Sequence, residues 1–87
     1  MAATQKRIIF TASTNRYSVA AEIKAITVDP SAAAWALDLT DENGNSIWQS
    51  GCATDTPFSI SFPTPVLVNA INPTTWTNIT KVIIYLE

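Results

Sequence analysis

Hydrophobic and polar residues alternate along most of this chain in short runs. Phe58, Ile60 and Phe62 alternate with Ser59 and Ser61, and other segments show the same period of two. Successive side chains of a β-strand point to opposite faces, so this period predicts strands with one buried face. Turn-forming residues separate the runs at intervals of roughly 8 to 12 residues, which is typical of a β-sandwich or barrel. The pattern predicts an all-β sandwich of about seven or eight antiparallel strands, with no helix longer than about two turns.

In two segments near the N-terminus, the spacing of apolar residues indicates which side chains share a face of the strand. Residues 6–12 place Ile8 and Phe10 on one face and Ile9 on the other. Residues 17–28 change parity midway, as one extra, bulged residue would make them do. We therefore expect one long strand, or two strands joined by a bulge, over residues 17–28.

Residues 35–51, "WALDLTDENGNSIWQSG", predict a strand, a tight turn and a returning strand. Asp38 belongs on the solvent side, which places Trp35 and the leucines beside it on the inner face. Asn43-Gly44 can supply the positive φ values that a tight hairpin needs. We expect this pair at the exposed tip of a hairpin.

The same turn has a partial likeness to a calcium loop. Asp41, Asn43 and Asn45 occupy the first three ligand positions. The glycine comes too early, at 44 instead of 46, and Cys52 stands where a bidentate glutamate would be needed. A hairpin turn accounts for these residues without misfit, so no metal site is predicted.

The second half of the chain predicts less regular strands. Pro63 and Pro65 should break the pairing or mark a sheet edge. Residues 66–71 predict another short strand. Residues 72–78, which include Trp76, predict a loop or a kinked strand.

Residues 80–87, "TKVIIYLE", are apolar on both faces. Val82, Ile84 and Leu86 share one parity, and Ile83 and Tyr85 share the other. Such a strand is typical of a central position, or of a position covered by a neighbouring subunit.

Composition favours association. Of the 87 residues, 47% are hydrophobic and 14% are charged, against about 25% charged in typical soluble domains. Either Ser, Thr and Asn keep the surface soluble, or copies or a partner cover part of it. The net charge of −2 and the lack of a dense basic cluster argue against nucleic acid as a partner. No apolar run is long enough to span a membrane, and the first residues do not resemble a secretory signal.

The residue types needed for most catalysis are missing. The chain has no histidine and one cysteine, Cys52, which removes serine–histidine and cysteine–histidine pairs, zinc sites and an intrachain disulfide. The seven acidic residues lie mostly in predicted turns or on outward faces. We therefore expect a non-enzymatic protein with no cofactor and no metal, and Cys52 as a small half-buried residue.

Two tryptophans are candidates for binding. Trp48 lies next to Ile47, so one of the two should point outward unless a bulge intervenes. Trp76 could be an exposed anchor, and Asn72 and Asn78 beside it offer a weak sugar-binding platform. Exposed aromatic residues also act as anchors of protein interfaces, and we favour that interpretation here.

The second apolar face of residues 80–87 predicts assembly, because one small sandwich can bury only one face of this strand in its own core. We expect a homotrimer whose contacts involve parts of residues 1–10, the segment around Trp76 and the terminal strand. The candidate interface residues are Ile8, Phe10, Trp76, Ile83 and Tyr85.

Read as a whole, the chain resembles short structural proteins of phages and prophages. The segments that carry the likeness are "RIIFTAST", "AEIKAITV", "WALDLTDENGNSIWQSG", "FSISFPTP" and "TKVIIYLE". The likeness lies in their layout over nearly all 87 residues and not in a diagnostic motif. This chain departs from that class in its tryptophan content and its short N-terminal arm, taken as residues 1–5.

The resemblance implies one compact, jelly-roll-like domain over residues 1–87 that decorates a capsid, often as a trimer. Its partner would be the major capsid protein or another virion protein, and it would be made in the host cytoplasm and end on the virion. A cyclic trimer matches the threefold points of a capsid lattice. Two alternatives stay open, namely a tail or baseplate accessory protein and a carbohydrate- or receptor-binding module.

Overall fold

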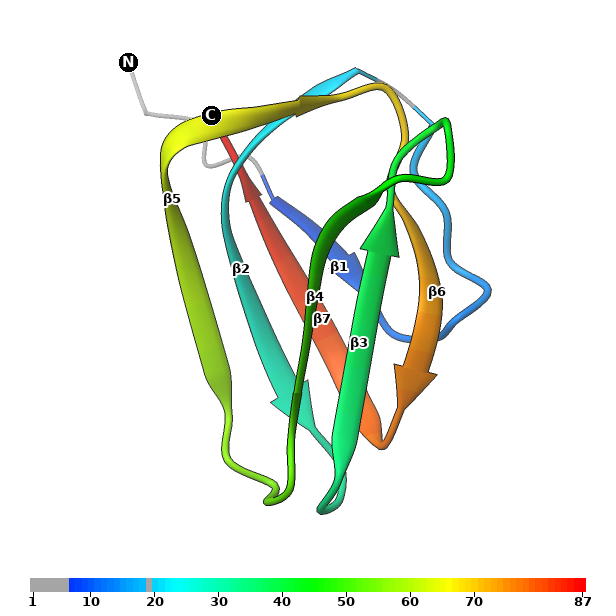
Figure 1. Ribbon diagram of the computed structural model, residues 1–87, viewed down its shortest axis with the longest axis vertical. Helices are drawn as coiled ribbons and strands as arrows, with labels where there is room; N and C mark the ends of the chain where they lie inside the picture. The colour runs from blue at the N-terminus through cyan, green and yellow to red at the C-terminus, as the bar shows by residue number, and fades with distance from the viewer. Residues whose placement is uncertain (1–6, 19) are drawn as a thin grey trace.

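The computed structural model describes residues 7–18 and 20–87, and its regular elements are all β-strands (Figure 1). The strands are β1 (Arg7–Phe10), β2 (Ala21–Pro30), β3 (Trp35–Thr40), β4 (Ser46–Cys52), β5 (Phe58–Val68), β6 (Asn72–Thr77) and β7 (Ile79–Leu86). They form a four-stranded sheet, β1-β7-β2-β5, and a three-stranded sheet, β4-β3-β6, with antiparallel pairing throughout. The predicted all-β sandwich of seven or eight antiparallel strands is confirmed, with seven strands among the described residues. The described part of the chain holds no helix that could cross a membrane.

The core lies between the inner faces of the two sheets. Trp35, Leu37 and Leu39 on β3 are each at most 2% exposed, as the solvent-side position of Asp38 predicts. The ring nitrogen Nε1 of Trp35 is buried without a hydrogen-bond partner among the described residues. An unsatisfied buried donor costs about 1–3 kcal/mol, so the packing of this ring outweighs that cost.

A bulge in β2 resolves the change of parity within residues 17–28. The register of β2 shifts between Ile23 and Ala25 against both of its neighbours, β5 and β7. Against β7, Lys24 is the extra residue, and it lets Ile23 and Ile26 both be fully buried although they stand three residues apart. The predicted bulge is confirmed. The predicted start of the strand at Tyr17 is wrong, because β2 begins at Ala21 and Tyr17 forms an isolated bridge to Ile71.

The edge strand β5 contains both prolines. Ser61 and Val66 pair with β2 on either side of the β2 bulge, so Pro63 and Pro65 lie in the stretch between these paired positions. Proline lacks the N–H that a paired strand must donate, so this edge position suits it. The prediction of a separate strand over residues 66–71 is wrong, because Val66–Val68 is the end of β5.

Trp76 lies in a strand and not in a loop. It sits in β6, opposite Leu37 of β3, and packs against the core. A register shift between Asp38 and Leu39 marks the kink that the prolines and threonines of residues 72–78 led us to expect. Because Leu37 points inward, its cross-strand neighbour Trp76 does so too.

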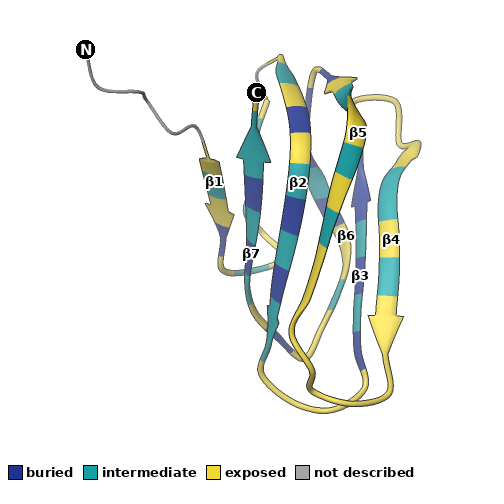
Figure 2. Ribbon diagram, turned by 90° about the vertical axis from the view of Figure 1, so that its left-hand side faces the viewer, coloured by how far each residue is buried: buried dark blue, intermediate teal, exposed yellow. Residues whose placement is uncertain are grey.

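The terminal strand β7 lies between β1 and β2, which confirms the predicted central position (Figure 1). Its Val82 and Ile84 are fully buried. Ile83 and Tyr85 have the opposite parity and are half-buried. Figure 2 shows this alternation of burial along β7 and β2.

The hairpin between β3 and β4 has one residue with positive φ, Gly44 at +79°. The Gly44 N–H donates to the Asp41 carbonyl at 3.1 Å, and the Asp41 N–H donates to the Asn45 carbonyl at 2.9 Å. These bonds close a three-residue loop in which the glycine takes the left-handed position. The expectation that Asn43 shares the positive φ is wrong, because Gly44 alone takes it in this hairpin. The Asp41 carboxylate accepts the Asn43 N–H at 2.9 Å and holds the turn in this conformation.

Beside this hairpin, a bulge in β4 settles the orientation of Ile47 and Trp48. Trp48 pairs with Leu39 and Ser46 pairs with Thr40, so Ile47 is the extra residue. Both Ile47 and Trp48 are half-buried and pack against the core. The sequence predicted that one of the two would point outward unless a bulge intervened, and this bulge lets both pack against the core.

Gly44 generates the first testable prediction. Gly44→Val should lower the free energy of unfolding by about 1–3 kcal/mol, because a β-branched residue is strained at positive φ. A Cβ at this position has nothing within 4 Å, so strain and not crowding would cause the loss. Gly44→Asn is the control and should lose less, since asparagine tolerates this conformation. Urea unfolding of the three proteins measures the effect, and equal losses for both variants would contradict it.

Candidate functional site

The outer face of the four-stranded sheet carries an apolar strip, made of Ile9 on β1 and Ile83 and Tyr85 on β7. Ile9 and Ile83 face each other in register, and Ile9 is 47% exposed. Tyr85 is the next outward residue of β7 and lies opposite Arg7. We call these three residues the outer strip.

Small uncharged residues continue the outer strip toward the β5 edge. Across the sheet, Ile83 is followed by Thr27 and Ser59, and Tyr85 is followed by Ala25 and Ser61. The Thr27 and Ser59 hydroxyls bond to each other at 3.0 Å. The side chains on this part of the outer face are therefore short and uncharged, so another surface can approach it closely.

The structure brings only part of the predicted interface set to the surface. Ile83 and Tyr85 face outward, as predicted. Phe10 is 2% exposed, and Ile8 packs beside it against the core. The prediction that Ile8 and Phe10 belong to an interface is wrong, because the pairing of β1 with β7 turns these two residues inward and Ile9 outward. Trp76 also packs inward, so it is no exposed anchor. The part of the predicted contact in residues 1–6 lies outside the described residues.

The suggested sugar platform around Trp76 is not assembled. The Asn78 amide donates to the carbonyls of Ala33 and Ala34, at 2.9 and 3.4 Å, and so fastens a loop. With Trp76 turned toward the core, its ring and this amide do not form a common exposed surface.

Phe58 is the most exposed aromatic ring on the described surface. It is 43% exposed and stacks on Trp48, with ring centroids 5.9 Å apart and planes inclined by 5°. The pair bridges the edges of the two sheets, since Trp48 lies in β4 and Phe58 begins β5. We call these two residues the edge stack.

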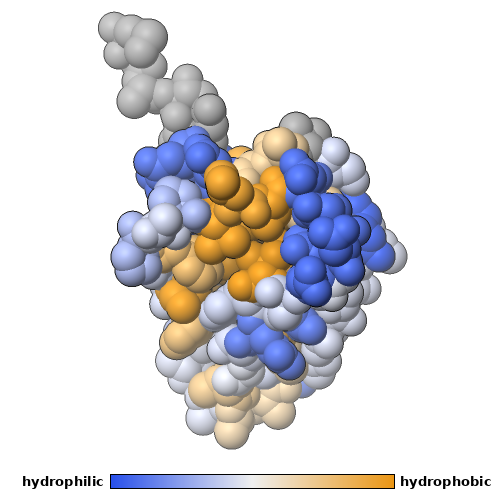
Figure 3. Space-filling view, turned by 45° about the horizontal axis from the view of Figure 1, so that its top comes forward, coloured by the Kyte–Doolittle hydropathy of each residue, from blue (hydrophilic) through white to orange (hydrophobic). Residues whose placement is uncertain are grey.

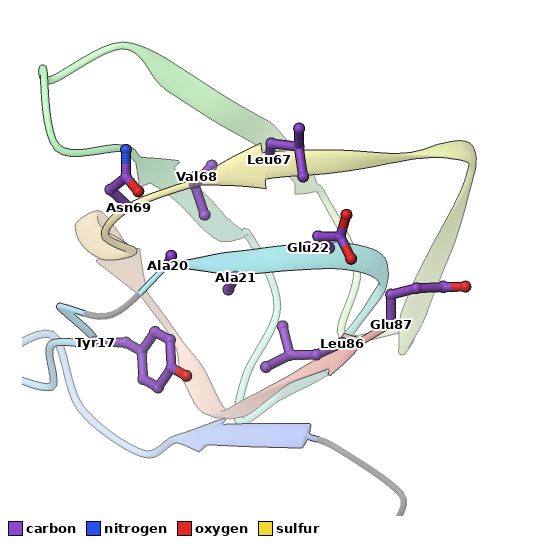
Figure 4. A pocket seen from close by; sticks show the side chains of 9 residues that line it. All are labelled: Tyr17, Ala20, Ala21, Glu22, Leu67, Val68, Asn69, Leu86 and Glu87. Carbon is purple, nitrogen blue, oxygen red and sulfur yellow. The ribbon is translucent and has the colours of Figure 1, made fainter.

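One end of the sandwich is hollowed, as the space-filling view shows (Figure 3). This end hollow has a volume of about 700 Å³. Figure 4 shows the residues that line it, which are Tyr17, Ala20, Ala21, Glu22, Leu67, Val68, Asn69, Leu86 and Glu87. Leu67 is 72% exposed, an unusual position for so large an apolar side chain. The volume is in the range of ligand sites, roughly 300–1,000 Å³.

The end hollow was not predicted from the sequence. Its residues come from the start of β2, the ends of β5 and β7 and the segment before β2, which are far apart along the chain. The one signal in the sequence is Leu67, whose parity opposes that of Val66 and Val68. Pairing Glu22 with Leu67 requires the register around the β2 bulge, which the sequence does not reveal.

A carboxylate fastens the β3–β4 hairpin to the rim of the end hollow. Glu42 accepts the Asn69 backbone N–H at 2.9 Å and the Asn69 amide N–H at 3.0 Å. The backbone bond from Asn69, with further hydrogen bonds, lowers the pKa of Glu42 below its usual value. Both oxygens of Glu42 accept hydrogen bonds from Asn69, and Oδ1 of Asp41 accepts the N–H groups of Asn43 and Asn45 within the turn.

Two further observations bear on possible chemistry. No group of three or more Cys, Asp or Glu side chains with metal-binding geometry occurs among residues 7–18 and 20–87. Cys52 is exposed, so the expectation of a half-buried cysteine is wrong. Cys52 is exposed because it lies at the end of the edge strand β4. Its thiol is in hydrogen-bond contact with the Thr54 hydroxyl at 3.3 Å. That hydrogen bond lowers the pKa of the thiol.

Comparison with known proteins adds one finding about the fold. The sequence matches no model of a known protein family and no curated protein. Among solved structures, the chain is similar to the family 32 CBM, a carbohydrate-binding module, from C. perfringens NanJ in complex with galactose. The TM-score is 0.53 at 12% sequence identity, over 78% of this chain and 60% of that one. The chain thus spans less than two thirds of that module and shares its β-sandwich architecture.

The bond between Glu42 and Asn69 generates a pH prediction. A carboxyl group whose pKa is lowered by folding stabilises the protein above its unfolded pKa, and loses that effect as the pH falls through the folded pKa. Glu42→Gln should therefore lower the melting temperature at neutral pH, and this difference should vanish in acid. The control, Asp55→Asn, removes an exposed carboxylate that makes no hydrogen bond to the described residues. Thermal unfolding across pH measures both, and a difference for Glu42→Gln that persists unchanged in acid would contradict the role of its charge.

Proposed function

We propose that this protein is a non-enzymatic structural protein of a phage virion that binds the capsid shell as a decoration protein, as a homotrimer. The resemblance of its segments to small phage structural proteins supports the virion assignment. The observation that carries the assembly part is the outer strip, an apolar surface on a sheet face whose neighbours toward the β5 edge are small and uncharged.

The outer strip supports association on energetic grounds. A single sandwich buries one face of β7 in its core, and Ile83 and Tyr85 on the other face need a second cover. Burial of a few hundred Å² of apolar surface contributes several kcal/mol at about 25 cal/mol per Å², before the cost of association. A neighbouring subunit on β1 would also protect the edge of the four-stranded sheet from open-ended pairing.

The proposed mechanism is mechanical. Each subunit makes a modest contact with the shell, and three linked contacts raise the apparent affinity through effective concentration. A trimer at a threefold point ties adjacent shell subunits together and resists the internal pressure of the packaged genome.

The assembly proposal predicts a mass. Light scattering on the purified chain should give about 28 kDa, three times 9.4 kDa. Ile83→Asp should shift the protein toward the monomer, because it buries an unpaired charge in the contact. Gln49→Asp on exposed β4 is the matched control and should leave the mass unchanged. A stable 9.4 kDa species for the unaltered chain would overturn the proposal.

Location on the particle tests the virion part separately. Antibody labelling of purified particles should place the protein on the capsid surface. Labelling confined to the tail would replace decoration with the tail or baseplate alternative, and no labelling of any particle would remove the virion assignment.

Carbohydrate binding is the second candidate, and the exposure of Phe58 in the edge stack is the observation that favours it. Aromatic rings offer a flat apolar surface on which a sugar ring can stack. The architecture shared with a module that was solved with galactose is consistent with this use.

The carbohydrate candidate predicts a signal from Phe58. Galactose and a panel of other sugars should perturb the Trp48 fluorescence of the unaltered protein, and Phe58→Ala should abolish the response. Leu67→Ala in the end hollow is the control and should keep it. The absence of a response to every sugar in the panel would count against this candidate.

A further inference from the structure

We infer that the end hollow binds a basic segment of a partner polypeptide, with an arginine or lysine head beside Glu22 and Glu87 and aliphatic groups against Leu67 and Leu86. This inference concerns a different surface from the outer strip and the edge stack. It does not rest on the proposed function.

The apolar part of the end hollow sets the first requirement on a ligand. Leu67 and Leu86 line it from two strands, with Ala20, Ala21 and Val68 between them and the ring of Tyr17 at one side (Figure 4). Leu67 remains 72% exposed in the free chain. A ligand with an aliphatic portion would remove this surface from water, which is favourable in proportion to the area covered.

The charge of the end hollow sets the second requirement. The Glu87 N–H donates to the Glu22 carbonyl at 2.8 Å, so the two glutamates lie opposite each other at the ends of β2 and β7. Their carboxylates do not point toward each other, but both residues line the end hollow (Figure 4). None of the nine lining residues is lysine or arginine. A cation bound in the end hollow would be attracted by both carboxylates.

The hydrogen-bonding groups set the third requirement and separate the candidate ligands. Asn69 uses its backbone N–H and its amide N–H on Glu42, and this fixes its amide nitrogen on that side and leaves its oxygen as an acceptor. The groups left to a ligand are this oxygen, two carboxylates and the Tyr17 hydroxyl. Acceptors therefore predominate. A guanidinium has five donors and no acceptor and therefore matches this set best, a sugar hydroxyl can both donate and accept, and an anion would be repelled.

The three requirements together describe a basic side chain on an aliphatic stem. Arginine and lysine bury their methylene groups on apolar surface and keep the charged head at the polar end. The volume of about 700 Å³ exceeds what one side chain fills, so neighbouring residues of the same segment would lie in the end hollow too. A polypeptide with a basic residue flanked by aliphatic ones meets all three requirements.

A peptide titration tests the inference. The probe is acetyl-Leu-Arg-Leu-amide, added to the isotope-labelled full chain and followed through backbone amide signals. The signals of Ala20, Ala21, Leu67 and Asn69 should shift, with a dissociation constant on the order of 1 mM, as is usual for so short a ligand without other contacts. The same peptide with citrulline in place of arginine keeps the shape and removes the charge, and it should bind at least about tenfold more weakly.

Matched variants locate the binding. The double variant Glu22→Gln, Glu87→Gln should weaken binding of the arginine peptide about tenfold or more. Asp38→Asn with Asp55→Asn makes the same change in net charge away from the end hollow, and it should leave the affinity unchanged. A circular dichroism spectrum shows that each variant keeps its strands.

Three outcomes would overturn the inference. The first is the absence of amide shifts in the end hollow up to about 10 mM peptide. The second is equal binding of the arginine and citrulline peptides. The third is a response of these same amides to methyl galactoside but not to the peptide, which would make the end hollow a sugar site. Failure of the light-scattering test, by contrast, would leave the peptide result untouched.

Discussion

The bulge at Lys24 in β2 is the constraint on which the arrangement of this sandwich depends. A strand with strict alternation could bury Ile23 or Ile26, but not both. The extra residue turns both inward and divides the four-stranded sheet into two parts with different registers. On the partner strand β5, the break coincides with the two prolines, which need no ladder bond there. Beyond the break, Glu22 is paired with Leu67, and the end hollow begins at this pair.

Low charge shapes the surface as strongly as the bulge shapes the core. A sandwich of 87 residues with 14% charged residues has few charges with which to cover two outer faces. Those charges are spread unevenly: toward the β5 edge the outer strip borders small uncharged residues, whereas the end hollow carries two carboxylates beside exposed leucine. The two surfaces therefore suit different partners. An apolar, nearly flat surface favours a subunit contact, and an acidic hollow favours a basic ligand.

The likeness to a carbohydrate-binding module illustrates how little a sandwich architecture says about its ligand. The shared features are the layers and strand directions, which follow from packing two sheets around one core. The site features of this chain are its own. Trp76, the tryptophan that the sequence offered as a platform, packs against the core from β6. The exposed aromatic ring is Phe58 of β5, which stacks on Trp48 at the opposite edge of the three-stranded sheet.

Local patterns alone determined the strand content, the inward faces of β3 and β7, the hairpin tip and the presence of a bulge in β2, because each follows from alternation or turn chemistry within a few residues. Tertiary structure decided which face of β1 is buried, since this strand has apolar residues on both faces, Ile8 and Phe10 on one and Ile9 on the other, and pairing with β7 selects between them. It also decided the direction of Trp76 and the whole of the end hollow. Those features join residues up to 70 positions apart, Tyr17 and Glu87 among them, and contacts between distant strands leave no periodic signal in the chain that forms them.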